Sequence, residues 1–421
     1  MAAVKPFNIS RAAVSEAYER IRKNGGTYGV DKVSLADFAE RLDDNLYKIW
    51  NRMSSGCYMP PAVRRVQIPK SGDKTRPLGI PTVADRIAQM VVKMSFEPSC
   101  EVVFHEQSYG YRPNRSAHMA VESVRNNCKL YSWAIDMDIQ SFFDTIDHHL
   151  LMKAVRRHTQ EKWVLLYIQR WLNAEIHTSE GILKPSGKGT PQGSVISPLL
   201  ANLFLHYVFD VWMEKYVPYC LFERYADDII VHCRSLMQAN TVRSQIQERF
   251  EQCGLQLHPD KTRVVYCKYG KSKNLGKNHP YQTFDFLGFC FKPRRQADEI
   301  LRVKAKWSFT PAISAKSEKK LMQKVRSWNL GRRTRETLNE LADMMNPVIR
   351  GWITYYGKFR PSELYNVLYR VNALLVKWAS RKFGKFKRSR LKASNWLKLV
   401  YQREPALFVH WKLVKANWSK Q

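Results

Sequence analysis

Apolar residues recur at helical spacing in several stretches of this chain. In VSLADFAERLDDNLYKIW they are separated by four, four and three positions from Phe38 to Ile49, which is the period of one helix face. Ser34 stands just before this run, where its hydroxyl can cap a helix. Further helices are expected over residues 116–128, 149–175 and 236–253, and over nearly all of the chain from residue 315 onward.

Other stretches have the alternation and the aromatic or β-branched content of strands. The segment AVRRVQIPKSGDKTRPLGIP, from residue 62, has the pattern of two short strands around a turn at 71–73. WAIDMDI, FERYADDIIVHC and FDFLGFCF begin at residues 133, 222 and 284 and are further candidates. Helices interrupted by strands predict an α+β fold.

The C-terminal pattern suggests a helix start at Asn346, since Pro347 suits the first helical position. The apolar stripe that follows is interpreted as core rather than as binding surface. It consists of Val348, Ile349, Trp352 and Tyr356.

The net positive charge of the chain limits the kinds of partner that it is expected to bind. The chain has 69 Lys and Arg residues against 37 Asp and Glu, and residues 301–421 hold 28 and 6 of these. Such an excess attracts a polyanion, either nucleic acid or an anionic membrane. A membrane span needs about 20 consecutive apolar residues, and neither such a run nor a secretory signal is seen. We therefore expect a cytoplasmic protein that binds nucleic acid and no membrane, with a domain boundary near 295–310.

The eight cysteines include no CxxC pair, so free and mostly buried thiols are expected and no zinc. His148 and His149 are adjacent. Because neighbouring residues point in different directions on a helix, we interpret them as solvated or core histidines rather than a metal pair.

Two acidic segments are candidates for chemistry. WAIDMDIQSFFDTIDH places Asp136 and Asp138 on one face of a strand, and RYADDIIVHC places Asp227 and Asp228 between apolar segments. A pair of acids at the tip of a hydrophobic hairpin is costly unless a cation compensates it. Carboxylates suit Mg²⁺, and two such ions about 3.5–4 Å apart catalyse phosphoryl transfer to nucleotides. Either segment alone is weak evidence for a metal site. The two together, on predicted strands of a very basic chain, are stronger evidence.

The motifs together resemble those of reverse transcriptases of the group II intron type. RYADDIIV is similar to their YxDD box, and WAIDMDIQSFFDTIDH to their motif A. The same order continues through RRVQIPKSGDKTRPLGIPTVADRIAQ, SYGYRPNRSAHMAV, GTPQGSVISPLLANLFL, FDFLGFCF and NPVIRGWITYYGKF. The resemblance covers most of the chain and implies an RNA-directed DNA polymerase that uses two Mg²⁺ ions and dNTPs.

It also implies a right-hand polymerase, with fingers and palm followed by an α-helical thumb or maturase domain and a short basic region. The expected divisions are a helical extension at 1–60, fingers and palm at 61–300, thumb or maturase at 301–380 and a nucleic-acid-binding tail at 381–421. The implied partners are an RNA template such as intron RNA, a DNA primer or target, and an RNA–DNA hybrid. The sequence leaves the oligomeric state open.

Residue roles follow from the same resemblance. Asp138 matches the first metal-binding aspartate, with Asp136 as an alternative, and Asp227 and Asp228 match the paired acids. Phe143, five positions after Asp138, falls at the steric gate that favours deoxynucleotides.

The remaining roles concern substrate and nucleic acid. Lys70 and Arg76 match residues that hold the incoming triphosphate, and Gln192 matches the glutamine near the nascent base pair. Lys261 is a candidate for protonating pyrophosphate, or a solvated loop lysine. The residues expected to contact nucleic acid in the tail are Lys382, Lys385, Lys387 and Arg388, although a solvated helical face has the same composition.

Three alternatives stay open from sequence. The chain resembles intron proteins that lack an HNH-type endonuclease, because no cysteine follows Cys290. Within that class it could act mainly as an RNA-binding splicing cofactor. A host-encoded antiphage-defence reverse transcriptase is the second alternative, and a retron enzyme is the third.

Overall fold

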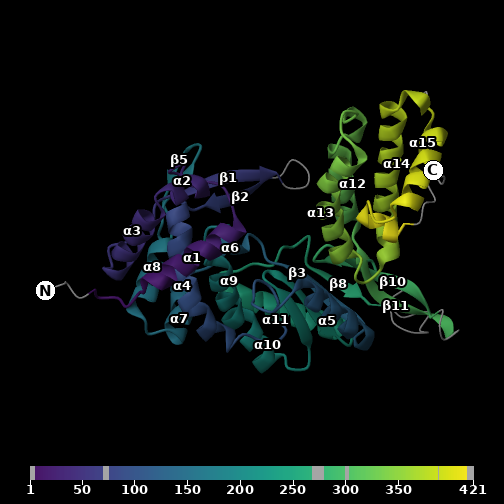
Figure 1. Cartoon of the computed structure of the whole chain (residues 1–421). Helices are drawn as coiled ribbons and strands as arrows, with labels where there is room; N and C mark the ends of the chain where they lie inside the picture. Colours follow the sequence, from purple (N-terminus) through teal and green to yellow (C-terminus); the bar gives the residue numbers. More distant parts are fainter. Residues whose placement is uncertain (1–4, 70–74, 268–278, 299–302, 387, 415–421) are drawn as a thin grey trace. The chain divides into compact units, whose positions relative to one another are not determined.

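The protein is described by a computed structural model over residues 5–69, 75–267, 279–298, 303–386 and 388–414 (Figure 1). The chain divides into two compact units, Met1–Ala120 with Trp133–Val264, and Val121–Ser132 with Val265–Gln421. No described helix is both long and apolar enough to cross a bilayer. Helices and mixed sheets occur together, which confirms the α+β expectation.

The first unit opens with three helices that gather around a longer one. They are α1 (Arg11–Asn24), α2 (Leu35–Glu40), α3 (Leu42–Ser54) and the longer α4 (Val83–Glu101). Ser34 caps α2 as expected, in a reciprocal capping box with Asp37. The single helix expected here is two, because the chain leaves helical geometry at Arg41 and the Asn45 side chain donates to the Phe38 carbonyl, 3.0 Å away.

A four-stranded sheet with order β2-β1-β4-β5 follows. The pair β1 (Val63–Pro69) and β2 (Thr75–Ile80) is antiparallel, which confirms the two strands expected from residue 62. The predicted turn between them lies outside the described residues. β4 (Ile176–Thr178) pairs in parallel with β1 and antiparallel with β5 (Gly181–Leu183).

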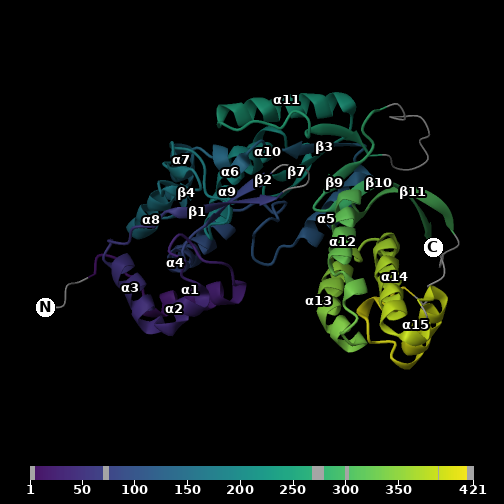
Figure 2. The same cartoon turned by 90° about the horizontal axis from the view of Figure 1, so that it is seen from above.

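A second four-stranded sheet has the order β6-β7-β3-β8, of which β6, β7 and β3 belong wholly to this unit. Its strands are β6 (Leu221–Tyr225), β7 (Asp228–Cys233), β3 (Trp133–Asp138) and β8 (Arg263–Tyr266). The other helices of this unit are α6 (Phe142–Thr145), α7 (His148–His158), α8 (Lys162–Leu172), α9 (Ser197–Leu205), the π-helix η1 (His206–Asp210), α10 (Val211–Tyr216) and α11 (Leu236–Gln252). Most of α5 (Ala117–Leu130) belongs to the second unit. The helix expected over 149–175 is thus two, α7 and α8. Figure 2 shows α11 running alongside β3 and β7, which it contacts.

The two faces of this sheet differ in character. Phe222 packs its ring against η1, and Arg224, two residues on, bonds to the same helix. Tyr225 points the other way, and its partner across the hairpin is Asp228, which in turn lies opposite Asp138. The apolar face therefore packs on helices, while the acidic residues project from the opposite face.

Arg224 is fully buried and makes a two-pronged ion pair with Asp210. Its Nε and Nη2 atoms donate to the two carboxylate oxygens at 2.7 and 2.5 Å, and its Nη1 donates to the Asn202 side chain at 3.0 Å. Burial acts to raise the pKa of Asp210, but the Arg224 charge and its hydrogen bonds outweigh burial and lower it. This pair fixes the β6–β7 hairpin to η1.

The second unit contains a long hairpin and a helical cluster. The sheet order is β11-β10-β9, from β9 (Phe284–Phe286), β10 (Phe289–Asp298) and β11 (Val303–Ile313). The single strand expected in FDFLGFCF is wrong, because Leu287 and Gly288 both adopt positive φ and turn the chain. The domain boundary expected near 295–310 stays a prediction. The described residues on either side of residues 299–302 belong to β10 and β11, which pair with each other, with Phe291 opposite Pro311.

The helices of this unit share one apolar cluster, and α14 and α15 lie side by side (Figures 1 and 2). They are α12 (Ala315–Ser327), η2 (Leu330–Arg332), α13 (Leu338–Tyr356), η3 (Pro361–Leu364), α14 (Tyr365–Lys382), η4 (Gly384–Phe386), α15 (Arg390–Arg403) and η5 (Val409–Lys412). The cluster includes Leu321, Ile349, Trp378, Leu397 and Trp411, so the described part of 381–421 folds with the preceding helices.

The expected helix start at Asn346 is wrong. Pro347 lies inside α13, whose N-cap is Thr337. The Asn346 side chain instead donates to the Leu407 carbonyl and accepts from the Val409 N–H, at 2.9 and 3.0 Å. The apolar stripe after Pro347 does pack in the core, as predicted.

The buried ion pair gives a stability prediction. Arg224→Met or Asp210→Leu should each destabilise the protein by about 3–5 kcal/mol, because each strands a buried charge. The double variant should lose clearly less than the sum of the two. Urea denaturation measures all three, and Glu19→Gln in the exposed pair with Arg22 is the control, with a loss of about 1 kcal/mol or less. Additive losses would contradict the pairing.

Candidate functional site

The acidic residues gather at one end of the β6-β7-β3-β8 sheet. Asp138 lies directly opposite Asp228 across the β3–β7 ladder, and such pairs have Cβ atoms about 4.5–5.5 Å apart. Asp227 occupies the turn that joins β6 to β7. Asp136 is two residues further from the tip, opposite Ile230. The fold therefore brings Asp138, rather than Asp136, beside the paired acids.

The turn that carries Asp227 is strained and supported from behind. Ala226 has φ +57°, a left-handed conformation that costs a non-glycine residue about 1–2 kcal/mol. Gly110 presses against it, since a Cβ at Gly110 would lie 2.5 Å from the Ala226 nitrogen. The Asn202 side chain donates to the Gly110 carbonyl at 2.6 Å, and Tyr109 N–H donates to the Arg224 carbonyl at 2.8 Å. The SYGY segment thus braces the hairpin tip.

Negative charge at this tip is balanced by two cations. Lys261 Nζ lies 2.6 Å from Asp138 Oδ2. The pKa of Asp227 is raised, chiefly by burial and also by the Asp138 carboxylate, while Arg76 and Lys261 act to lower it. Burial and the nearby Asp227 likewise raise the pKa of Tyr111. An ammonium held at this short distance shows that the site attracts positive charge.

The donor set fits a hard divalent cation. Asp138 and Asp228 face the same side of the sheet and Asp227 adjoins them, so every candidate ligand is a carboxylate oxygen. Within the described ranges no group of three or more His, Cys, Asp or Glu residues is close enough to hold a metal ion. Mg²⁺ takes waters and substrate phosphates as ligands besides carboxylates, and Asp138, Asp227 and Asp228 are the residues that would hold it.

The loop that contains Gln192 contacts strand β2 through both its backbone and its side chain. Arg76 Nε donates to Gln192 Oε1, and Gly79 N–H donates to the Gln192 carbonyl, both at 2.6 Å. Gly193 has φ +108°, and a Cβ there would lie 2.5 Å from the Gly79 carbonyl oxygen. Only glycine fits this close approach. The two sequence candidates Arg76 and Gln192 are therefore in direct contact.

Phe143 lies in the short helix α6 that follows β3, and the residue is buried, with 7% of its surface exposed. Its carbonyl accepts the Thr190 N–H at 2.7 Å, so the Gln192 loop is also tied to this helix. Lys70, the other expected triphosphate ligand, lies outside the described residues.

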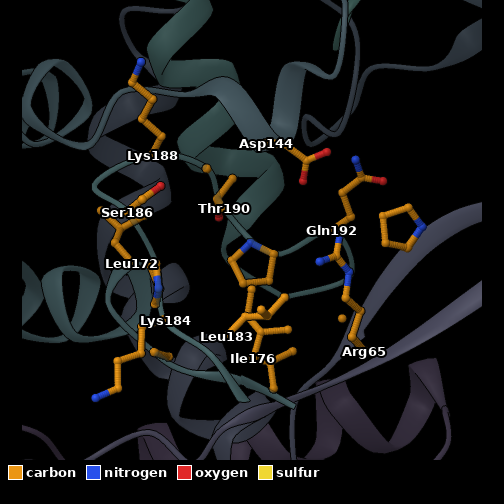
Figure 3. A pocket seen from close by; sticks show the side chains of 17 residues that line it. Arg65, Asp144, Leu172, Ile176, Leu183, Lys184, Ser186, Lys188, Thr190 and Gln192 are labelled. Atoms are coloured by element: carbon orange, nitrogen blue, oxygen red, sulfur yellow. The ribbon is translucent and has the colours of Figure 1, made fainter. Parts of the chain in front are cut away.

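A pocket of about 190 Å³ adjoins this loop (Figure 3). Gln192 and Arg65 stand on one side of it, and Lys184 and Lys188 on the other. The sequence analysis did not single out Arg65, Lys184 or Lys188, because isolated basic residues in a basic chain do not by themselves indicate a binding site.

The basic residues expected to contact nucleic acid differ in their surroundings. Lys382 Nζ donates to the Glu336 and Thr334 carbonyls, at 2.7 and 3.0 Å, so it holds the fold together. Lys385 and Arg388 are exposed. Lys387 lies outside the described residues.

Sequence reasoning also missed Arg224, Asp210, Asp85 and Gln89. Each is buried, although the strand and the long helix that carry three of them also hold other charged residues, such as Glu223, Arg86 and Lys93. Charged residues in a strand or helix usually lie on its exposed face, so the sequence pattern alone did not mark these four as buried.

Comparison with known proteins agrees with this geometry. Residues 68–291 match the family model for reverse transcriptase (RNA-dependent DNA polymerase), and residues 318–396 match the group II intron maturase-specific domain.

Three curated relatives are similar to the chain. Protein YkfC of Escherichia coli is 35% identical over 59% of this chain and 74% of its own length. The group II intron-encoded protein LtrA of Lactococcus lactis is 34% identical over 45% of this chain and 32% of its own length. A 91 kDa protein in the cob intron of Schizosaccharomyces pombe is 32% identical over 48% and 25%. The matches thus span about three quarters of the first relative and a third or less of the other two.

Proposed function

The chain belongs to the reverse transcriptase family and carries a group II intron maturase-specific domain, and from that premise we propose that Asp138, Asp227 and Asp228 catalyse cDNA synthesis. Nucleotidyl transfer in this family needs divalent metal. Two Mg²⁺ ions would activate the primer 3′-hydroxyl and neutralise the leaving pyrophosphate. The observation that carries the proposal is the register of Asp138 with Asp228 beside the turn residue Asp227.

The surrounding residues bind and orient the substrates in this proposal. Arg76, with its Nε fixed by Gln192, presents its remaining guanidinium donors to the dNTP triphosphate. Lys70 is proposed to bind the same group. Lys261, whose Nζ lies 2.6 Å from Asp138 Oδ2, gives a proton to the departing pyrophosphate in this proposal. Phe143 excludes a ribose 2′-hydroxyl.

The chain binds an RNA template and DNA, as its family requires. We propose that the RNA is the chain's own intron and that binding assists splicing, because residues 318–396 match the maturase domain. That match favours an intron protein over a defence enzyme, and the proposed compartment is the cytoplasm. A folded ribozyme in the DNA that flanks the reading frame would support the intron assignment, and its absence would favour the defence role.

The carboxylates give the first functional prediction. Asp227→Asn should lower dNTP incorporation on a primed RNA template with Mg²⁺ by roughly 10³-fold or more, because one metal ligand is neutralised. Asp43→Asn, an exposed carboxylate in α3, is the matched control and should be fully active. Near-normal synthesis by Asp227→Asn, with an unchanged melting temperature, would rule out the metal assignment.

Sugar selection gives the second. Phe143→Ala should raise incorporation of rNTPs relative to dNTPs by roughly 10- to 100-fold, since removing the ring admits the 2′-hydroxyl. Phe142→Ala truncates the neighbouring buried ring in α6 and serves as the control for lost packing. An equal change in both variants would argue against Phe143 as the gate.

The basic C-terminal residues give the third. Lys385→Ala with Arg388→Ala should weaken RNA binding and reduce the slope of log K against log salt by about 0.7–0.9 for each phosphate that the variant no longer neutralises. The control removes two exposed lysines elsewhere, Lys23 and Lys48. If both double variants and the parent have equal RNA affinities and equal salt slopes, Lys385 and Arg388 are solvated surface residues that do not contact RNA.

A further inference from the structure

Asp85 in α4 is fully buried and accepts three hydrogen bonds from neutral groups. Tyr58 Oη and Trp171 Nε1 donate to its Oδ1 at 3.0 and 2.8 Å, and Gln89 Nε2 donates to its Oδ2 at 2.9 Å. The Asp85 N–H itself bonds to the N-cap Thr82, so the carboxylate lies in the first turn of α4, where the helix dipole favours negative charge.

Gln89 passes this interaction on to another segment. Because its Nε2 is committed to Asp85, its Oε1 faces the chain after the Gln192 loop and accepts the Val195 N–H at 2.8 Å. A carboxylate only accepts and a backbone N–H only donates, so Gln89 fits between them in one orientation alone. Asp85 therefore decides which end of the Gln89 amide meets Val195.

Val195 stands three residues after Gln192, whose backbone and side chain contact β2. The loop is thus held at Gly79 and Arg76 on one side and at Gln89 on the other. Breaking the Gln89 hydrogen bond removes the loop's tie to α4 on its C-terminal side, just before α9.

We propose that Asp85 is a positioning residue for the incoming nucleotide, acting through Gln89 on the loop that carries Gln192. This rests on the proposed function, in which Gln192 lies near the nascent base pair. Burial raises the pKa of Asp85 to about 6, so the carboxylate is ionised at about pH 8, where the assays are to be run.

Asp85→Asn tests the relay with almost no change in shape. Asn keeps one oxygen for Tyr58 and Trp171 and turns an NH₂ group toward Gln89 Nε2, which places two donors face to face. Gln89 must then reverse its amide, and its NH₂ meets the Val195 N–H. We expect the KM for dNTP to rise about 10-fold, as for one lost buried hydrogen bond, while kcat changes by less than about 3-fold.

A swap of the two side chains should restore the relay. In the double variant Asp85→Asn with Gln89→Glu, the new carboxylate accepts both from the new amide and from the Val195 N–H, and the net charge equals that of the parent. KM should return to within about 3-fold of the parent value. Gln89→Glu alone faces one carboxylate with another and should be impaired.

Hydrogen exchange of the peptide 189–199 gives a readout that does not require synthesis. Exchange at Val195 should quicken in Asp85→Asn and slow again in the swap, with melting temperatures recorded to exclude global unfolding. If the parent protein makes no DNA, the proposed function fails. The hydrogen-bond relay from Asp85 through Gln89 to Val195 is then tested by hydrogen exchange alone. Unchanged exchange in Asp85→Asn overturns it. If Asp85→Asn exchanges faster but keeps the parent KM in an active enzyme, the role in nucleotide positioning is overturned. A double variant that regains the parent's stability but not its KM overturns that role as well.

Discussion

The guanidinium of Arg224 is buried beneath the hairpin that presents Asp227 and Asp228, and its charge is balanced by Asp210 of the π-helix η1. Three features meet in this contact: the strand that precedes the turn, the helix that covers the back of the sheet, and Asn202, which also bonds the Gly110 carbonyl behind the tip. A π-turn shifts the residues that follow it by one position around the helix axis. The ion pair ties the strand before the acidic turn to η1.

The acids can lie together because the sheet separates its two faces. Arg224 and Phe222 face the covering helices, while residues one position out of phase face the other way. A shift of one residue in the β3–β7 register would place Asp138 on the apolar face. Close approach at the tip needs Gly110, which has no Cβ to strike Ala226. Strain at Ala226 is thus held by packing and not by local sequence preference.

The loop that carries Gln192 is organised by a different principle, hydrogen bonds whose direction is forced. Gly79 donates to its carbonyl, Arg76 donates to its side chain, and Gln89 accepts the N–H of Val195 beyond it. Two of these partners lie in β2 and the third lies in α4. The loop therefore depends on α4 and β2 for its conformation, which connects a buried carboxylate at Asp85 with a surface where a nucleotide is proposed to bind.

The sequence by itself determined the α+β class, most elements of the first unit and the family, because periodicity, capping at Ser34 and ordered motifs are local properties. The sequence pattern misplaced a helix start at Asn346, whose side chain bonds to the carbonyl of Leu407, far along the chain. It also predicted one strand across Leu287, where a positive φ turns the backbone.

The motif resemblance favoured Asp138 over Asp136, which share a strand face, and only the tertiary structure showed that the register puts Asp138 beside the pair. It also supplied the partners of Arg224 and Asp85. A buried charge in the sequence indicates that a partner is needed, but the partner's identity depends on how distant segments pack.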